Sequence, residues 1–363
     1  ISNEEIIKCL NDSGLKGKGG AGFPTGRKWE LVLQNEGEKF IAINGDEGEP
    51  GTFKDKLYLE TDPHRFLEGV LIASKVMNAK KVYIYLRDEY PVAIEILRRE
   101  ISKLEKENLI EKNDLILRRG AGAYICGEES SMIESIEGKR GLPRNRPPYV
   151  AQIGLFGKPT LVNNIETIYC LRDILEKGAE WFVNQGVKGG KGFHSYSVSG
   201  RVKKPGVKVA PAGTTVQELI DDYCDGMLEG HIFKGYLPGG ASGGILPAKF
   251  NNIPLDYGSK ELTELGCFLG SAAVVVLSDK DSMKDAGLNL LKFFEEESCG
   301  QCTPCRVGTE KTVKIMKEKI WNKEKLEDLS EVMAEASICG LGQAASNPLR
   351  SVMRHFEEEI TYE

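Results

Sequence analysis

The stretch of residues 14–29, GLKGKGGAGFPTGRKW, constrains the fold of this chain more than any other. Part of its backbone carries no β-carbons, so a flat or anionic ligand can approach the amides closely; these positions are Gly17, Gly19, Gly20 and Gly22. Basic side chains surround them at Lys16, Lys18, Arg27 and Lys28. The stretch therefore predicts a site for a phosphate group and an aromatic ring. The alternative is a flexible glycine linker, in which Phe23, Pro24 and Trp29 would be unusual.

The context of this stretch differs from that of an ordinary Rossmann site, although it contains a G-x-G-x-x-G match. That fingerprint follows a β-strand, whereas residues 4–11 have apolar side chains at helical spacing, and Gly14 would end this helix in the left-handed conformation. A second helix follows, with Thr25 as its expected N-cap. Its buried side would carry Trp29, Leu31 and Val32. We therefore expect a loop between two helices, with the amides of a helix N-terminus facing the ligand.

Strand-like and helix-like segments alternate after this loop. We expect strands at 39–44, 81–86 and 114–119, and helices at 63–77, 91–108 and from 163 to 175. The alternation predicts an α/β fold with a mostly parallel, Rossmann-like sheet. Glycine-containing turns at 44–51 and 120–129 follow two of the strands. Because ligands gather at the carboxyl ends of parallel strands, both turns are expected at one binding site.

The pattern changes after Gly189-Gly190. A hairpin at 193–198 and 204–209 precedes a short helix capped by Thr214, which suggests a β-grasp-like module. From Asp281 onward the apolar residues recur at helical spacing, which predicts a small helical bundle. We therefore expect three domains, at 1–188, 189–270 and 271–363.

Composition excludes several classes of protein. The net charge of −6 argues against a nucleic-acid binder. No run approaches the roughly 18 apolar residues of a membrane span, and we identify no signal peptide. The nine cysteines are typical of reduced thiols and metal ligands, so we expect a cytoplasmic-type, reducing compartment. The four histidines occur in no paired arrangement, and we expect them to be surface or packing residues.

Four cysteines near the end of the chain predict a metal centre. Cys299, Cys302 and Cys305 stand at intervals of three residues, and Cys339 lies in a glycine-bracketed turn between two expected helices. Four thiolates on a helical scaffold suit a [4Fe–4S] cluster. Zinc is the main alternative, although it usually takes two separate C-x-x-C pairs. Disulfides or idle buried cysteines would also account for these thiols.

Five motifs in this order carry a resemblance to a known family. They are the glycine stretch, NGDEGEPG at 44–51, GEE at 127–129, KPTLVNNIET at 158–167, and the C-x-x-C-x-x-C set with Cys339. The chain resembles the flavin-bearing, NADH-oxidising subunit of respiratory complex I. It is equally similar to the diaphorase subunits of NAD-dependent hydrogenases and formate dehydrogenases. The resemblance implies an FMN domain, a β-grasp domain of the soluble-ligand-binding type and a helical [4Fe–4S] domain.

The resemblance also implies roles for individual residues. FMN would be held by Gly17, Lys18, Gly19, Gly20, Gly22, Lys28, Asn44, Asp46, Val162, Asn163 and Asn164, and Thr167 also belongs to the cofactor-binding set. Asn164, at a helix start, would offer amides to the phosphate. The nicotinamide nucleotide would contact Phe23, Glu49 and Glu129, with Phe23 stacking on its rings, and Glu47, Tyr124, Gly127 and Glu128 complete the cofactor-binding set.

The expected nucleotide is NAD(H), because the Glu129 carboxylate can accept hydrogen bonds from ribose hydroxyls and would repel a 2′-phosphate. For Glu47, Glu49 and Glu129 taken alone, the alternative is a solvated acidic turn. Three positions depart from the family pattern: Leu31 and Tyr149 stand where relatives often carry Phe, and Arg146 stands where Lys is common.

The function implied is that of a diaphorase-type oxidoreductase subunit, which exchanges hydride between NAD(H) and FMN and passes single electrons to or from the cluster. The family also implies two partners, a small [2Fe–2S] thioredoxin-like subunit and a larger iron–sulfur or catalytic subunit, at or near the inner membrane. The same chemistry could run toward NAD reduction in a hydrogenase or formate dehydrogenase, with or without electron bifurcation. The alternative function from a different class, which is not enzymatic, is that of a ligand-binding or assembly subunit with a structural cluster.

Overall fold

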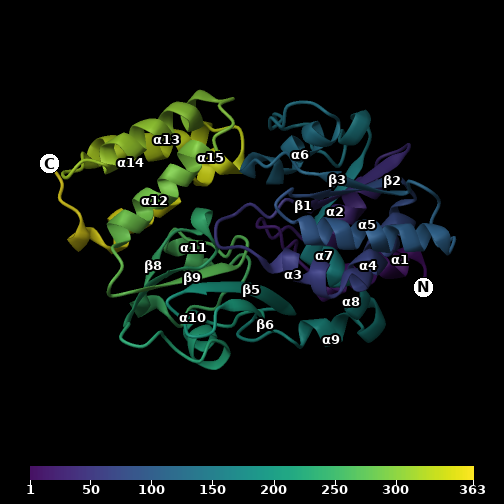
Figure 1. Cartoon of the computed structure of the whole chain (residues 1–363), viewed down its shortest axis with the longest axis horizontal. Coiled ribbons are helices and arrows are strands. Elements are labelled where there is room, and N and C mark those ends of the chain that lie inside the picture. Colours follow the sequence, from purple (N-terminus) through teal and green to yellow (C-terminus); the bar gives the residue numbers. More distant parts are fainter. The chain divides into compact units, whose positions relative to one another are not determined.

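The computed structural model describes all 363 residues and divides the chain into two compact units. The first unit comprises residues 1–48 and 53–193, and the second comprises residues 49–52 and 194–363. Figure 1 labels their helices and strands. No helix in either unit combines the length and the apolar character that crossing a membrane requires.

The first unit contains a four-stranded parallel sheet in the order β3-β2-β1-β4, which confirms the predicted α/β fold. Its strands are β1 (Lys39–Gly45), β2 (Ala79–Leu86), β3 (Leu115–Arg119) and β4 (Thr160–Asn164). In register, Asn44 of β1 pairs with Tyr85 of β2 and Asn164 of β4. Strand β4 was not expected, because its three apolar or β-branched residues are too few to distinguish it from a loop between Pro159 and Asn163.

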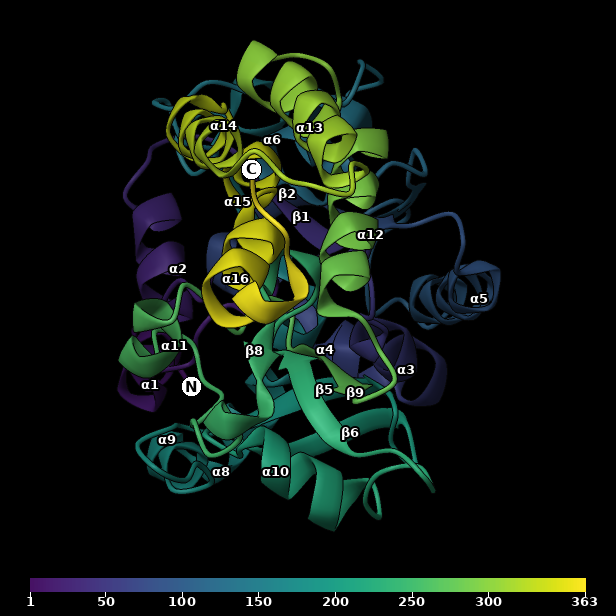
Figure 2. The same cartoon turned by 90° about the vertical axis from the view of Figure 1, so that its left-hand side faces the viewer.

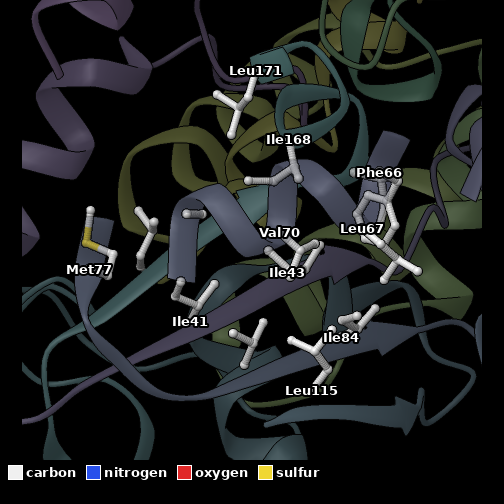
Figure 3. Close-up of a cluster of buried hydrophobic side chains, with 14 of the residues drawn as sticks. Ile41, Ile43, Phe66, Leu67, Val70, Met77, Ile84, Leu115, Ile168 and Leu171 are labelled. Carbon is white, nitrogen blue, oxygen red and sulfur yellow. The ribbon is translucent and has the colours of Figure 1, made fainter. Parts of the chain in front are cut away.

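Helices cover both faces of this sheet. Figure 1 shows α4 (Pro63–Met77) and α6 (Glu129–Ile136) on opposite sides of the strands, and both pack against β1 and β2. In Figure 3 the apolar side chains of α4, among them Val70, face those of the strands, among them Ile43. The remaining helices of this unit are α1 (Asn3–Ser13), α2 (Thr25–Leu33), α3 (Lys54–Thr61), α5 (Pro91–Lys106), α7 (Ile165–Tyr169), α8 (Leu171–Lys177) and α9 (Ala179–Val183).

Several local predictions can be compared with the structure. Helix α1 ends at Gly14 with φ of 64°, as predicted. Thr25, however, is not the N-cap of α2: Pro24 occupies that position, and Thr25 is the buried first residue of the helix. Trp29 and Val32 are buried as expected, whereas Leu31 is only half-buried. The helix expected from 163 to 175 is interrupted at Cys170 and forms α7 and α8.

The second unit contains a mixed five-stranded sheet in the order β6-β5-β9-β7-β8. Strands β5 (Phe193–Gly200) and β6 (Gly206–Pro211) form the predicted hairpin region, and β7 (Phe233–Leu237), β8 (Leu246–Pro247) and β9 (Ala273–Ser278) complete the sheet. The central strand β9 follows residue 270, the predicted end of the second domain. The same unit contains the short helices α10 (Val216–Glu218) and α11 (Lys260–Glu264). Helix α10 is capped by Thr215 and not, as predicted, by Thr214.

The last 80 or so residues form the predicted helical bundle within the second unit. Figure 2 shows its helices, of which α12 (Met283–Glu296) packs against both α13 (Thr303–Met316) and α16 (Asn347–His355). Helix α14 (Lys323–Ala336) packs against α13, and the short α15 (Gly340–Ala344) packs against α14. The interior contains Leu291, Val313, Met316, Trp321, Leu326 and Leu349.

Candidate functional site

Four segments that are distant in sequence meet at the carboxyl edge of the first sheet. The glycine loop (residues 14–24) reaches the start of α7, where the Lys18 amide donates to the Thr167 hydroxyl at 2.8 Å. The Asn44 side-chain amide donates to the Gly127 carbonyl at 2.8 Å and so joins the end of β1 to the 124–129 turn. The Lys28 ammonium donates to the Val162 carbonyl at 3.3 Å. The predicted motifs of the first unit therefore converge on one site.

The glycine loop is a closed structure and not a linker. The Gly17 amide donates to the Phe23 carbonyl, and the Thr25 amide donates to the Leu15 carbonyl, each at 2.8 Å. A β-carbon at Gly19 would lie 3.2 Å from the β-carbon of Asn164, so the loop backbone rests directly on that residue. Gly20 and Gly22 have φ of 124° and 64°. These positive values explain why the loop requires glycine there.

The aromatic and amide side chains around this loop are held in place. The Trp29 indole N–H donates to the Asn163 Oδ1 at 2.9 Å, and both side chains are buried. The Asn164 Oδ1 accepts from the Glu166 amide at 2.9 Å, so this side chain caps α7 and already uses one helix-start amide. Phe23 is 43% exposed, which leaves its ring available for stacking.

The acidic residues fall into two groups. Glu47 is buried and accepts from the amides of Asp55 and Lys56 and from the Tyr90 hydroxyl, so it is not a solvated turn residue. Burial and the nearby Asp55 charge raise the pKa of Glu47 to about 7. Glu128 similarly caps α6 through the amides of Ser130 and Ser131.

Glu129 lies between two cations and remains partly exposed. Its carboxylate is 3.5 Å from the Lys28 ammonium and 3.6 Å from the Arg146 guanidinium, which also forms an ion pair with Glu128. About a quarter of the Glu129 side chain is exposed. A carboxylate held in this way can accept hydrogen bonds from a sugar.

The remaining predicted residues of these turns occupy different surroundings. The Asp46 amide donates to the Asn44 Oδ1 at 3.1 Å, and a β-carbon at Gly48 would lie 3.1 Å from the Tyr124 ring. Glu49 belongs to the second unit, where its Oε1 accepts from both the amide and the hydroxyl of Ser242 at 2.7 Å.

The sequence did not identify a buried ion network behind this edge. Lys54, Asp55 and Glu166 are each nearly inaccessible to solvent, and they contact the predicted residues Lys18, Glu47 and Asn164. In the sequence, Lys54-Asp55 resembles an ordinary solvated helix start. Only the burial of these charged residues distinguishes them.

The four predicted metal-ligating cysteines lie at the helical bundle. Cys299 and Cys302 precede α13, Cys305 lies in its first turn, and Cys339 immediately precedes α15. Burial, together with the nearby thiols of Cys302, Cys339 and Cys299, raises the pKa of the Cys305 thiol to about 11.

The chemistry of this thiol set suits a cluster better than a single ion. All nine cysteines are free, so none of them forms a disulfide. A [4Fe–4S] cluster takes four thiolates, one on each iron, which matches the number of cysteines in this set.

Two serine hydroxyls beside the thiols support the same assignment. The Ser298 hydroxyl lies 3.3 Å from the Cys305 sulfur, and the buried Ser337 hydroxyl has no hydrogen-bond partner in the protein. A β-carbon at Gly342 would lie 2.5 Å from that hydroxyl and 2.9 Å from the Cys305 β-carbon. Ser337 therefore offers a buried polar atom next to a predicted ligand, as expected where cluster sulfurs accept hydrogen bonds.

Comparisons with known proteins found matches over the two regions of the chain that contain these candidate sites. Residues 10–173 match the family model described as the Nuo51 FMN-binding domain, and residues 285–363 match the NADH-ubiquinone oxidoreductase-F iron-sulfur binding region. The chain is 42% identical to the F subunit of NADH-quinone oxidoreductase of Aquifex aeolicus, over 99% of this chain and 86% of that protein. It is 39% identical to the F 2 subunit of the Rhizobium meliloti enzyme, over 98% of this chain and 88% of that protein.

A solved structure is also similar. It is an NAD⁺-reducing [NiFe]-hydrogenase in the H₂-reduced state, with a TM-score of 0.90 and 35% sequence identity. The match covers 99% of this chain but only 62% of the hydrogenase chain.

These findings define the class of the protein as an FMN- and [4Fe–4S]-binding oxidoreductase subunit that exchanges electrons with NAD(H). Within this class, the chain belongs to the family of the F subunits of NADH-quinone oxidoreductase. A zinc site and a non-catalytic assembly role are therefore not supported.

Proposed function

We propose that the site at the carboxyl edge of the first sheet holds FMN and that NADH is oxidised there. The observation that carries this proposal is the set of hydrogen bonds that joins the glycine loop, the end of β1, the 124–129 turn and the start of α7. The FMN-binding set is Gly17, Lys18, Gly19, Gly20, Gly22, Lys28, Asn44, Asp46, Val162, Asn163, Asn164 and Thr167. Glu47, Tyr124, Gly127 and Glu128 support it by shaping the two turns.

The individual contributions follow from the surroundings of each residue. The glycine loop presents bare backbone to the ligand, and Asn164 holds it at the correct distance. Lys18 acts chiefly through its backbone, because its ammonium is buried and donates to the Phe193 carbonyl at 2.6 Å. Exposed Phe23 stacks on the nicotinamide, and Glu129 accepts hydrogen bonds from a ribose. For Glu49 the proposed contact with the nucleotide rests on the family resemblance alone, because its carboxylate accepts hydrogen bonds from Ser242 in the second unit.

Cys299, Cys302, Cys305 and Cys339 are the proposed cluster ligands. When bound, FMN supplies the chemistry that connects a two-electron hydride donor to a one-electron cluster. No acid–base pair is needed in the protein, whose residues position the nucleotide and flavin and tune their potentials. A three-domain division remains our proposal, with the first boundary after residue 188 and the second moved from 270 to the end of β9, so that Ala273–Ser278 belongs to the second module.

The protein works as one subunit of a larger redox complex in this proposal. Its relatives are named as subunits of NADH-quinone oxidoreductase, and the family resemblance implies a [2Fe–2S] thioredoxin-like partner and a larger iron–sulfur or catalytic subunit. Nine free thiols suit a reducing, cytoplasmic compartment, with the complex peripheral to the inner membrane. Electron flow from NAD(H) is the main proposal, because the relatives that match most of their own length are named NADH-quinone oxidoreductase subunits. NAD reduction in a hydrogenase-type complex is the second candidate, favoured by the TM-score of 0.90.

Anaerobic purification tests the proposal. The protein should show flavin absorbance, an iron–sulfur shoulder that dithionite bleaches, and NADH oxidation with ferricyanide. Cys302→Ser should lose the cluster and keep flavin-dependent ferricyanide reduction, whereas Cys9→Ser, at an isolated half-buried thiol, should keep both. Protein without flavin or iron would refute the proposal, and a full cluster signal in Cys302→Ser would refute ligation by that residue.

A further inference from the structure

A buried ion network connects three of the proposed FMN-binding segments. The Lys54 ammonium lies 2.8 Å from the Asp55 Oδ1 and 2.9 Å from the Glu166 Oε2. Glu166 also lies 3.9 Å from the Lys18 ammonium in the glycine loop. The exposed fractions are 1% for Lys54, 2% for Asp55, 3% for Glu166 and 2% for Lys18. Few proteins bury so many charges together, because each loses its hydration.

The network reaches the flavin site through Asn164. The Asp55 Oδ2 accepts from the Asn164 Nδ2 at 2.6 Å, while the Asn164 Oδ1 accepts from the Glu166 amide at 2.9 Å. Two members of the network therefore fix both ends of this side-chain amide. The Nδ2 carries two hydrogens, so one remains for a ligand once Asp55 has accepted the other. The β-carbon of Asn164 also supports the glycine loop at Gly19.

The network also fixes the turn after β1. The Asp55 amide donates to the Glu47 Oε1 at 2.9 Å, and the Tyr90 hydroxyl donates to the Glu47 Oε2 at 2.9 Å. The start of α3, where Lys54 and Asp55 lie, is thereby held to the turn that contains Asp46. Without the Lys54 charge, Asp55 and Glu166 would face each other in a dry interior, and Asp55 could not keep its position toward Asn164.

We propose that Lys54 is a positioning residue of the flavin site, which fixes the Asn164 amide through Asp55 and contributes a positive charge to the site. This inference rests on the proposed assignment of Asn164 to the FMN site. Lys54 touches none of the reacting atoms. Its charge stabilises added negative charge nearby, so its removal makes reduction of the bound flavin less favourable.

The test compares Lys54→Met with Lys56→Met. Lys56 lies two residues along the same helix, but its ammonium is partly exposed and pairs with Glu60 at 3.9 Å. Both variants are purified as the full chain, and the FMN dissociation constant is measured by flavin fluorescence. We expect Lys54→Met to weaken FMN binding at least tenfold and to lower the flavin midpoint potential, and Lys56→Met to change neither. Lys54→Arg should retain the potential, because it keeps the charge.

A double-mutant cycle distinguishes positioning from general destabilisation. In an Asn164→Ala background, Lys54→Met should add less than threefold to the dissociation constant, because the group that it positions is already absent. Where Lys54→Met does not fold, Lys54→Met/Glu166→Gln, which removes one charge of each sign, replaces it in the cycle. Folded variants with unchanged FMN affinity and potential, or with fully additive effects, would overturn the inference. If Asn164→Ala alone left FMN binding unchanged, the proposed site assignment would fail as well.

Discussion

Ser298 provides the most quantitative prediction for the cluster. Its hydroxyl lies 3.3 Å from the Cys305 sulfur, and this hydrogen bond opposes the rise in the Cys305 pKa that burial causes, as expected of a donor to a thiolate. Hydrogen bonds to charged groups contribute about 1.5–3 kcal/mol. If the added electron strengthens the hydrogen bond by roughly half of this energy, Ser298→Ala destabilises the reduced cluster relative to the oxidised cluster by about 1 kcal/mol. For one electron, the midpoint potential then falls by ~40 mV.

Redox titration followed by electron paramagnetic resonance measures this shift in the purified full chain. Ser298→Thr keeps a hydroxyl at the same position and should stay within about 15 mV of the parent, because the donor remains. The cluster content of both variants should match that of the parent. An unchanged potential in Ser298→Ala, with the cluster fully assembled, would refute the argument that this hydroxyl donates to the ligand sulfur.

Three further predictions concern nucleotide selectivity, packing and pH. Glu129→Gln should raise kcat/KM for NADPH roughly tenfold, because it removes a carboxylate that repels the 2′-phosphate and leaves Lys28 and Arg146 in place. Steady-state kinetics with both nucleotides measures this. An unchanged ratio of kcat/KM for NADPH to kcat/KM for NADH would contradict the prediction. Gly69→Ala should lower the free energy of unfolding by roughly 1–3 kcal/mol in denaturant titration, because the added β-carbon would lie 2.3 Å from the Ile168 carbonyl oxygen. This clash should outweigh the preference of alanine for helices. A stabilised variant would show that α4 and α7 do not pack this closely. His64, Arg99 and Lys103 lower the pKa of Glu100 to about 2, so its contribution to stability is present above the unfolded pKa and is lost as the pH falls from about 4.5 toward 2. The difference in melting temperature between the parent and Glu100→Gln should therefore shrink across that range, and a constant difference would contradict the assignment.

The sequence was sufficient for the elements with strong local signals. Helix α4 was predicted at its observed bounds because Asp62-Pro63 starts it and apolar residues follow at helical spacing. Cap positions differed by one residue from those predicted. At α10 the neighbouring Thr215 suits the cap as well as Thr214 does, whereas α2 begins after Pro24 without a side-chain cap, so a rule based on capping side chains chose Thr25. Strand β4 has a signal too short to distinguish it from a loop, although tertiary pairing with β1 forms it.

The candidate site was predictable in outline and not in its interior. The glycine loop was identified by its composition, and parallel-strand geometry implied that the turns at 44–51 and 120–129 meet. The Asn163-Asn164 segment was identified through the family resemblance. The buried charges could not be identified in this way. Lys54, Asp55 and Glu166 are residue types that normally face solvent, and only the fold shows that they face one another.

The central claim is that electrons from NADH reach the cluster only through bound flavin. The most direct measurement is anaerobic NADH titration of the same preparation before and after removal of FMN, with the reduced cluster detected by electron paramagnetic resonance and dithionite as the control for cluster integrity. We expect NADH to reduce the cluster in the FMN-loaded protein and to leave it oxidised in the FMN-free protein, while dithionite reduces both. Reduction of the cluster by NADH without flavin, or an oxidised cluster with flavin and NADH present, would contradict the claim.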